Sequence, residues 1–173
     1  TLDGSTQPNG NVIIDGNGFS DYGLELTSAN NTVVDGLIYD DFQFAGIRVG
    51  ANSNDCVIGT TKNGNTFTNH RFGVIVEGAR ASIRNNTFDN NEINGVFVTG
   101  NGSATIGEEG NPSAGNIFLN HRFAGVEANR NTDYVNIFGN SFFCNEAEGI
   151  TNFNGANNNI DPPTITEATT AIV

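Results

Sequence analysis

Short stretches of alternating apolar and polar residues recur along the chain. The clearest stretch covers residues 86–98, where an Asn-x-Phe-x-Asn segment precedes a Gly-Val-Phe-Val segment. Residues 116–128 have the same length and pattern, and residues 65–76 form the same unit with one residue fewer. Alternation with period two predicts half-buried β-strands. No segment keeps a 3.6-residue period for long enough to predict a helix.

The units recur at a regular interval. A glycine opens each short apolar strand, at Gly23, Gly46, Gly73, Gly95, Gly125 and Gly149. The spacings are 23, 27, 22, 30 and 24 residues, and the two long spacings contain insertions at residues 60–64 and 108–113. A unit of about 22 residues remains without these insertions, as is typical of repeat architectures. Each unit holds three strand-like pieces: one after the glycine, one before a turn, and one centred on an aromatic residue.

Three short strands per unit predict an all-β fold, a parallel β-helix (solenoid) of about six to seven coils. Coils stacked ~4.8 Å apart would place like residues in interior columns. The first expected column contains Phe67, Phe88, Phe118 and Phe142, with Tyr39 above them. The second contains Phe44, Phe72, Ile93 and Phe123, and the third contains Ile58, Ile83, Ile106 and Ile137, with Val34 above. The alternative is an antiparallel sandwich, which would not repeat identical residues at one phase.

The glycine-led strands and the Asn-x-Phe-x-Asn segments resemble the right-handed parallel β-helix repeats of the pectate-lyase-like superfamily, as found in large secreted bacterial surface proteins. The resemblance covers about residues 10–160 and implies a right-handed solenoid in a secreted or cell-surface protein. It implies no particular activity, because this fold hosts many. We assign residues 1–161 to the β-helix and residues 162–173, which are rich in β-formers, to an extended C-terminal strand.

The C-terminal strand has two interpretations. It either opens the next module of a longer chain or pairs with a neighbouring subunit. Neither end of the sequence shows a clear polar cap, which solenoids usually need for solubility. The expected partners are therefore flanking β-domains of a longer chain, or further copies of this chain in a head-to-tail filament.

Polar residues also recur at fixed phases. Asn65, Asn86, Asn116 and Asn140 each lie two residues before the column aromatic, while Asn69, Asn90 and Asn120 lie two residues after it, with Asp41 in phase. Stacked amides can hydrogen-bond from coil to coil, so both sets predict ladders at corners. Arg71, Glu92, Arg122 and Glu146 follow the aromatic by four residues, and their alternating signs predict a charge ladder. His70 and His121 share a phase but lie two coils apart, too far to share a metal ion, and indicate duplication.

Composition narrows the function classes. The chain has 22 Gly and 29 Asn, which predict many turns, and 19 acidic against 7 basic residues, a net charge of -12. That charge argues against nucleic-acid binding, which needs clustered Lys and Arg. No apolar run approaches the roughly 20 residues of a membrane span. Cys56 and Cys144 lie at different phases about three coils apart, so both are predicted to be free thiols, with Cys56 buried.

Two groups of residues are candidates for function. Ile75 and Phe97 are neighbours in the column expected to face outward, so they form a contact face for a partner or are covered by the chain's own loops. Asp35, Asp40 and Asp41 are weak candidates for calcium ligands, with an ordinary turn as the alternative. No other cofactor is indicated. The resemblance directs attention to Gly-His-Gly and to Asn-Thr-Asp before paired aspartates, but neither arrangement occurs here.

Two functions are therefore compatible with the sequence. The first is a non-catalytic structural or adhesive module of a secreted cell-surface protein or extracellular fibre, with possible head-to-tail assembly. Regular coils, short loops and missing site motifs favour it. The alternative is a carbohydrate-binding or polysaccharide-cleaving β-helix, with lyase-like or hydrolase-like activity and calcium as a candidate cofactor. The resemblance raises this alternative, and no catalytic residue is assigned.

Overall fold

The computed structural model describes residues 1–7, 12–129, 131–132, 134–153 and 155–156. Within these residues, 18 short strands form three sheets, and the one helical element is the 3-10 turn η1 (Pro112–Ala114). Sheet A contains β1 (Leu2–Asp3), β4 (Val33–Asp35), β7 (Cys56–Ile58), β10 (Arg80–Ile83), β13 (Ser103–Gly107) and β16 (Val135–Phe138). Sheet B contains β2 (Val12–Asp15), β5 (Leu37–Asp40), β8 (Thr66–Thr68), β11 (Thr87–Asp89), β14 (Ile117–Leu119) and β17 (Ser141–Phe143). Sheet C contains β3 (Tyr22–Leu26), β6 (Ala45–Val49), β9 (Phe72–Glu77), β12 (Asn94–Thr99), β15 (Val126–Asn129) and β18 (Ile150–Phe153).

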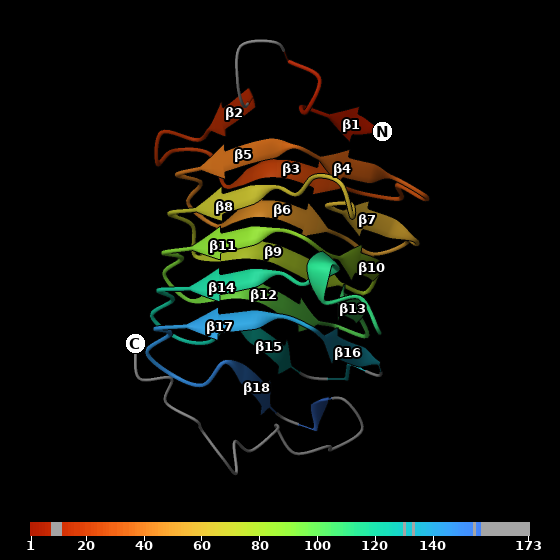
Figure 1. Cartoon of the computed structure of the whole chain (residues 1–173), viewed down its shortest axis with the longest axis vertical. Coiled ribbons are helices and arrows are strands. Elements are labelled where there is room, and N and C mark those ends of the chain that lie inside the picture. Colours follow the sequence, from red (N-terminus) through yellow and green to blue (C-terminus); the bar gives the residue numbers. More distant parts are fainter. Residues whose placement is uncertain (8–11, 130, 133, 154, 157–173) are drawn as a thin grey trace.

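Successive strands fall in sheets A, B and C in turn, so three strands make one coil. Six coils stack along the long axis, from red near the N-terminus to blue at the last described coil (Figure 1). Every strand pairing in the described part of the chain is parallel. The prediction of an all-β parallel solenoid with three strands per coil is confirmed, and the antiparallel sandwich is excluded. The predicted boundary after residue 161 and the C-terminal strand of residues 162–173 lie outside the described residues.

Aromatic rings form a continuous file in the interior, behind sheet B. Its members pair in register from coil to coil: Tyr39, Phe67, Phe88, Phe118 and Phe142. Successive ring centroids are 5.2, 4.9, 4.8 and 5.0 Å apart, and the ring planes differ by 5° to 11°. A second file, behind sheet A, places Val34, Ile58, Ile83, Ile106 and Ile137 in register. Full burial of such side chains contributes roughly 1.5–3 kcal/mol each, so the two files form much of the core, together with the buried residues of sheet C such as Ile47, Val74 and Val96.

The glycine that opens each strand of sheet C makes room for the ring file. A Cβ added at Gly73 would lie 2.5 Å from Cδ1 of Phe88 and 2.6 Å from the carbonyl oxygen of Gly95. Any side chain at this position would therefore push the ring of the next coil or the neighbouring strand. The glycine period seen in the sequence is set by this close approach, because a backbone without Cβ is the closest neighbour that a ring can have.

The corner between sheets A and B carries a buried asparagine ladder. Nδ2 of Asn65 donates to Oδ1 of Asn86 at 3.0 Å, Asn86 donates to Asn116 at 3.0 Å, and Asn116 donates to Asn140 at 2.8 Å. Each oxygen also accepts the backbone N–H of the asparagine one coil earlier. These bonds satisfy polar groups that would otherwise be buried without partners, so the ladder fixes the stacking of the coils.

The corner between sheets B and C needs a left-handed backbone. Asp41, Asn69, Asn90 and Asn120 have φ between 52° and 63°, and Cys144 occupies the same place with φ 52°. Asn and Asp tolerate this conformation better than most residues. Nδ2 of Asn90 donates to Oδ1 of Asn69 at 2.8 Å. The predicted free thiols are confirmed, with Cys56 buried and Cys144 exposed.

The second predicted column is wrong, because the register shifts at Phe72. Phe72 pairs with Ala45 of the preceding coil and Asn94 of the next, not with Phe44 and Ile93. This coil has one residue fewer between its interior ring and its glycine, and the pairing of β9 closes the gap by moving Phe72 forward one place. The set also lies outside the main core: Phe44 and Ile93 are only partly buried, and they pack with Phe72 in a separate cluster.

Candidate functional site on the outer face of sheet C

The residues expected to face outward from sheet C do form one column. Their register from coil to coil is Glu25, Arg48, Ile75, Phe97, Glu127 and Thr151. They alternate with the buried interior residues of the same strands, as the period-two pattern requires. The outer face of sheet C therefore presents a charged upper part, an apolar centre and a polar lower part.

Of the two alternatives for Ile75 and Phe97, the structure shows cover from within the chain rather than an exposed contact face, although an aromatic ring of the sheet provides this cover and not a loop. Ile75 is only 4% exposed, and Phe97 is partly buried. The ring of Phe72 stacks on that of Phe97, with centroids 5.1 Å apart and planes 24° apart. The shifted register places Phe72 on the outer side, where it covers the pair. The sequence did not identify Phe72 as the covering residue, because its place was counted from the interior ring and not from the strand pairing.

Further rings extend this cover toward the N-terminal coils. The Phe44 ring makes edge contacts with Phe72 at 5.5 Å and with Tyr22 at 5.6 Å, measured between centroids. Two guanidinium groups lie over the same rings: Arg71 is 5.3 Å from the centroid of Phe44, and Arg48 is 5.9 Å from that of Tyr22. Cation–π contacts of this kind contribute about 0.5–1 kcal/mol at exposed sites. We call Tyr22, Phe44, Phe72 and Phe97 the outer aromatic group.

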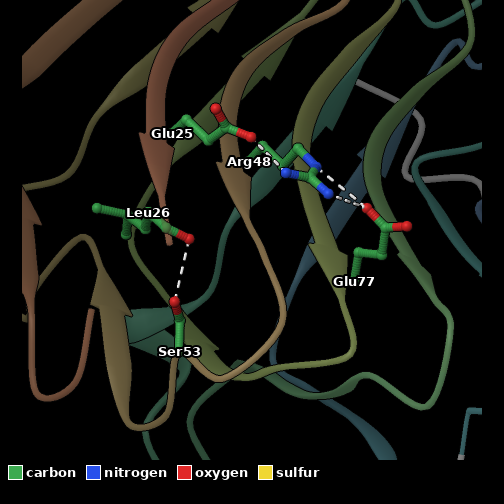
Figure 2. Close-up of polar contacts among 5 residues, drawn as sticks. All are labelled: Glu25, Leu26, Arg48, Ser53 and Glu77. Carbon is green, nitrogen blue, oxygen red and sulfur yellow. Dashed lines mark hydrogen bonds and ion pairs between the residues drawn. The ribbon is translucent and has the colours of Figure 1, made fainter. Parts of the chain in front are cut away.

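Arg48 joins three coils on this face. Its Nε and Nη2 donate to Oε2 of Glu77 at 3.0 and 2.6 Å, and its Nη1 donates to Oε1 of Glu25 (Figure 2). The hydrogen bonds that Arg48 donates to Glu77, followed by the one that it donates to Glu25, raise the pKa of its guanidinium group. Ser53, near the ends of the same strands, donates its hydroxyl to the carbonyl of Leu26 at 3.0 Å (Figure 2). The charged part of the face therefore links coil to coil.

Glu127 is a buried carboxylate that sequence reasoning did not single out. It is only 7% exposed, although it belongs to the outward column. Its Oε2 accepts a hydrogen bond from Nδ2 of Asn94 at 2.6 Å, and its Oε1 accepts one from Nδ2 of Asn129 at 2.7 Å. The two amide donors satisfy both carboxyl oxygens, which lowers the free-energy cost of burying this polar group. The one feature of the sequence that could have pointed to Glu127 is the spacing of the glycine-led strands, which places it opposite Phe97 of the preceding coil.

A groove of about 410 Å³ runs beside sheet C along the corner with sheet B. Its lining includes Gly18, Asp41, Gln43, Asn69, Asn90 and the charged residues Arg71, Glu92 and Arg122. Glu92 lies between the two arginines, at 3.9 Å from Nε of Arg71 and 3.7 Å from Nη1 of Arg122. These long, exposed ion pairs contribute at most about 1 kcal/mol each. Glu146, the fourth member of the predicted charge ladder, is exposed on the next coil.

The three calcium candidates do not converge. Asp35 is buried at the end of β4, where its carboxylate accepts bonds from the backbone N–H and the hydroxyl of Thr60 at 3.2 and 2.8 Å. Asp40, at the end of β5, accepts a bond from Nδ2 of Asn69 at 2.8 Å. Asp41 occupies the left-handed corner position. Among the described residues, no three His, Cys, Asp or Glu side chains gather as a metal site would require.

A scan against family models matched none, and searches of curated proteins and of solved structures also found no match. The strand pairing itself defines the class of protein: the chain is a parallel β-solenoid with three sheets. Across the described residues, no helix has the length and apolar character needed to cross a bilayer.

Proposed function

We propose that the chain is a non-catalytic structural or adhesive module of a secreted cell-surface protein or extracellular fibre. The observation that supports this most is the use of its polar side chains to join coils. Carboxylates that an enzyme would hold free for substrate accept bonds from neighbouring coils instead, as Asp35 does from Thr60 and Glu127 does from Asn94. Such a molecule is a stiff rod with a regular surface, which suits a spacer or a scaffold for adhesion.

The proposal extends to the family of the protein. We propose that the chain is one of the right-handed parallel β-helix proteins of the pectate-lyase-like superfamily. The three-sheet topology, the glycine-led strands of sheet C and the Asn ladder of the A–B corner support this assignment. Right-handed connection of parallel strands is also the general rule for this kind of crossover.

The first test measures whether the protein cleaves polysaccharides. The protein is incubated with a panel of acidic and neutral polysaccharides, with and without added calcium, and new unsaturated or reducing ends are measured. We expect no product above the buffer blank. Product formation that disappears in the Asp41→Ala variant would contradict the proposal and favour the enzymatic alternative, because Asp41 lines the groove.

Self-association is the second part of the proposal. Within the described residues, β16, β17 and β18 each pair with a neighbour on one side. Parallel edges of this kind can pair with another chain, either a flanking β-domain or a second copy in a head-to-tail filament. Negative-stain microscopy of the purified chain distinguishes these cases. Fibres are expected for the filament, whereas isolated short rods would contradict self-assembly and leave the module in a longer chain.

Glycan binding is the second candidate function, and the outer aromatic group favours it. Tyr22 and Phe44 are partly exposed beside the guanidinium groups of Arg48 and Arg71. Aromatic faces next to charged donors suit the apolar face and hydroxyl groups of a sugar. Binding to an immobilised glycan panel is measured for Tyr22→Ala and, as a matched control, for Tyr134→Ala, which alters a ring 68% exposed beside sheet A. Loss of binding in the first variant alone supports this function, and equal binding in both contradicts it.

A further inference from the structure

The B–C corner contains a second ladder of side chains, one per coil. Its members follow the interior ring by three residues: Phe42, His70, Asn91, His121 and Asn145. Within it, histidine and asparagine alternate. We call this set the corner ladder. It lies behind the groove described above, and His70 and Asn91 also contribute to the groove lining.

Histidine and asparagine accept the same backbone bond in this ladder. The N–H of Phe42 donates to Nδ1 of His70 at 3.0 Å, and the N–H of His70 donates to Oδ1 of Asn91 at 3.1 Å. The N–H of Asn91 then donates to Nδ1 of His121 at 3.2 Å, and the N–H of His121 donates to Oδ1 of Asn145 at 3.1 Å. Four bonds thus join five successive coils, with an imidazole nitrogen or an amide oxygen as the acceptor.

On their opposite side, three of the ladder residues, His70, Asn91 and Asn145, face the carbonyl of the ring residue one coil earlier. Nδ2 of Asn91 donates to the carbonyl of Phe67 at 3.3 Å, and Nε2 of His70 lies 3.2 Å from the carbonyl of Tyr39. Because Nδ1 of His70 accepts a bond, its proton is on Nε2, and the ring is neutral. Nε2 of His121 is buried without a hydrogen-bond partner. A Cβ at Gly95 would lie 2.8 Å from that atom, so the ring is tightly enclosed.

Protonation cannot be accommodated in this arrangement. A proton on Nδ1 would turn the acceptor into a donor that faces the backbone N–H of Phe42 or Asn91. Each of these N–H groups would lose its bond, and the charge would be buried, which costs about 1–3 kcal/mol or more for each unsatisfied group. Burial lowers the pKa of His70 to about 4 and that of His121 to about 4.

The charged groups around the two rings do not reverse this effect. Asp40 acts on His70 and Asp89 acts on His121, and each carboxylate partly offsets the cost of burial. Around the groove, Asp41 and Glu92 are balanced by the guanidinium groups of Arg71 and Arg122. The glycines of β6 and β12 that face the two rings bring no charge.

We propose that the corner ladder is an acid-sensitive joint, which loosens the B–C corner in mild acid when His70 and His121 take up protons. The joint is intact when both rings are neutral. An unfolded or opened histidine has an ordinary pKa near 6.5, so the contribution of the two rings is complete above that value and falls as the pH drops toward 4. At pH 5 a pKa of about 4 raises the opening equilibrium constant about 30-fold per histidine.

The chain supplies its own matched control, because Asn91 and Asn145 perform the same bonding without a titratable group. The experiment compares the unaltered protein with the His70→Asn/His121→Asn variant. Amide hydrogen exchange of Phe42 and Asn91 is measured at pH 7.5 and pH 5.0 and corrected for the intrinsic exchange rate. In the unaltered protein we expect protection of the two amides to fall about 30-fold or more. In the variant we expect it to stay nearly constant.

An equal loss of protection in both proteins would overturn the proposal, because carboxylates elsewhere would then be responsible. An unaltered protein that keeps full protection at pH 5.0 would overturn it too. A second measurement does not depend on the variant folding: the imidazole resonances of the two histidines, the only ones in the chain, are titrated by NMR. Rings that stay neutral until the corner opens support the joint, and a titration near pH 6.5 in the closed protein contradicts it.

Discussion

The interior ring file and the outer aromatic group use the same residue type under different constraints. In the file, successive rings lie 4.8 to 5.2 Å apart and within 11° of parallel. In the outer group, the planes of contacting rings differ by 24° to 85° and the spacing reaches 5.6 Å. The interior rings are held between a strand of sheet B and the glycines of sheet C. Of the outer rings, Tyr22, Phe44 and Phe97 are only partly buried and can tilt, whereas Phe72 is buried among them.

The difference between the two sets of rings shows that the interior residues determine how the coils stack. Parallel pairing fixes the distance between coils, and only rings that stack flat fit that distance in an enclosed interior. On the outer face, a ring can lie one place along the strand from the equivalent residues of the adjacent coils, as Phe72 does, without disturbing the strand pairing. Substitutions in the file should therefore act on the whole solenoid, whereas those in the outer group should act locally.

The largest effect is expected for Phe88→Ala, in the middle of the file. The ring is fully buried between Phe67 and Phe118, and its loss leaves a cavity that two flanking rings cannot fill. We expect the free energy of unfolding to fall by about 3–5 kcal/mol, as measured by chemical denaturation. A loss below about 1 kcal/mol would show that the file is not the main source of stability.

A smaller effect is expected for Phe72→Ala, which removes the cover of the outer aromatic group. The ring contacts Phe44 and Phe97, but neighbouring rings and solvent can move into its place. We expect a loss of about 2 kcal/mol, together with exposure of Ile75 to an apolar dye. If this variant is destabilised as strongly as Phe88→Ala, the contrast between interior and outer rings fails.

Tyr39→Phe should stabilise the file. Tyr39 is the one tyrosine among its five rings, and its hydroxyl is buried without a hydrogen-bond partner. Burial also raises the pKa of this phenol. Removing an unsatisfied hydroxyl should raise the free energy of unfolding by about 1 kcal/mol, seen as a higher Tm. A lower Tm would mean that the hydroxyl has a partner in solution, such as water.

The smallest effect is expected for Arg48→Gln, on the charged part of the outer face. The side chain is 25% exposed and bridges two carboxylates that are themselves 45% and 46% exposed. Screening by solvent keeps such pairs to about 1 kcal/mol or less. We expect a loss of that size at low salt and almost none at high salt. A large loss that does not respond to salt would indicate that Arg48 acts through packing on Tyr22.

The amino-acid sequence by itself determined the period, the three strands per coil and the residues of both interior files. The glycine and asparagine intervals carry this information, since side chains that stack in register must recur in sequence. Three features were determined only by the tertiary structure: the forward shift of Phe72, the burial of Ile75 and Glu127, and the hydrogen bonding of Asp35 to Thr60. Each depends on which residue of an adjacent coil lies opposite. Because the units differ in length by one residue, the sequence does not determine which residues lie opposite each other. The backbone hydrogen bonds between coils set that register.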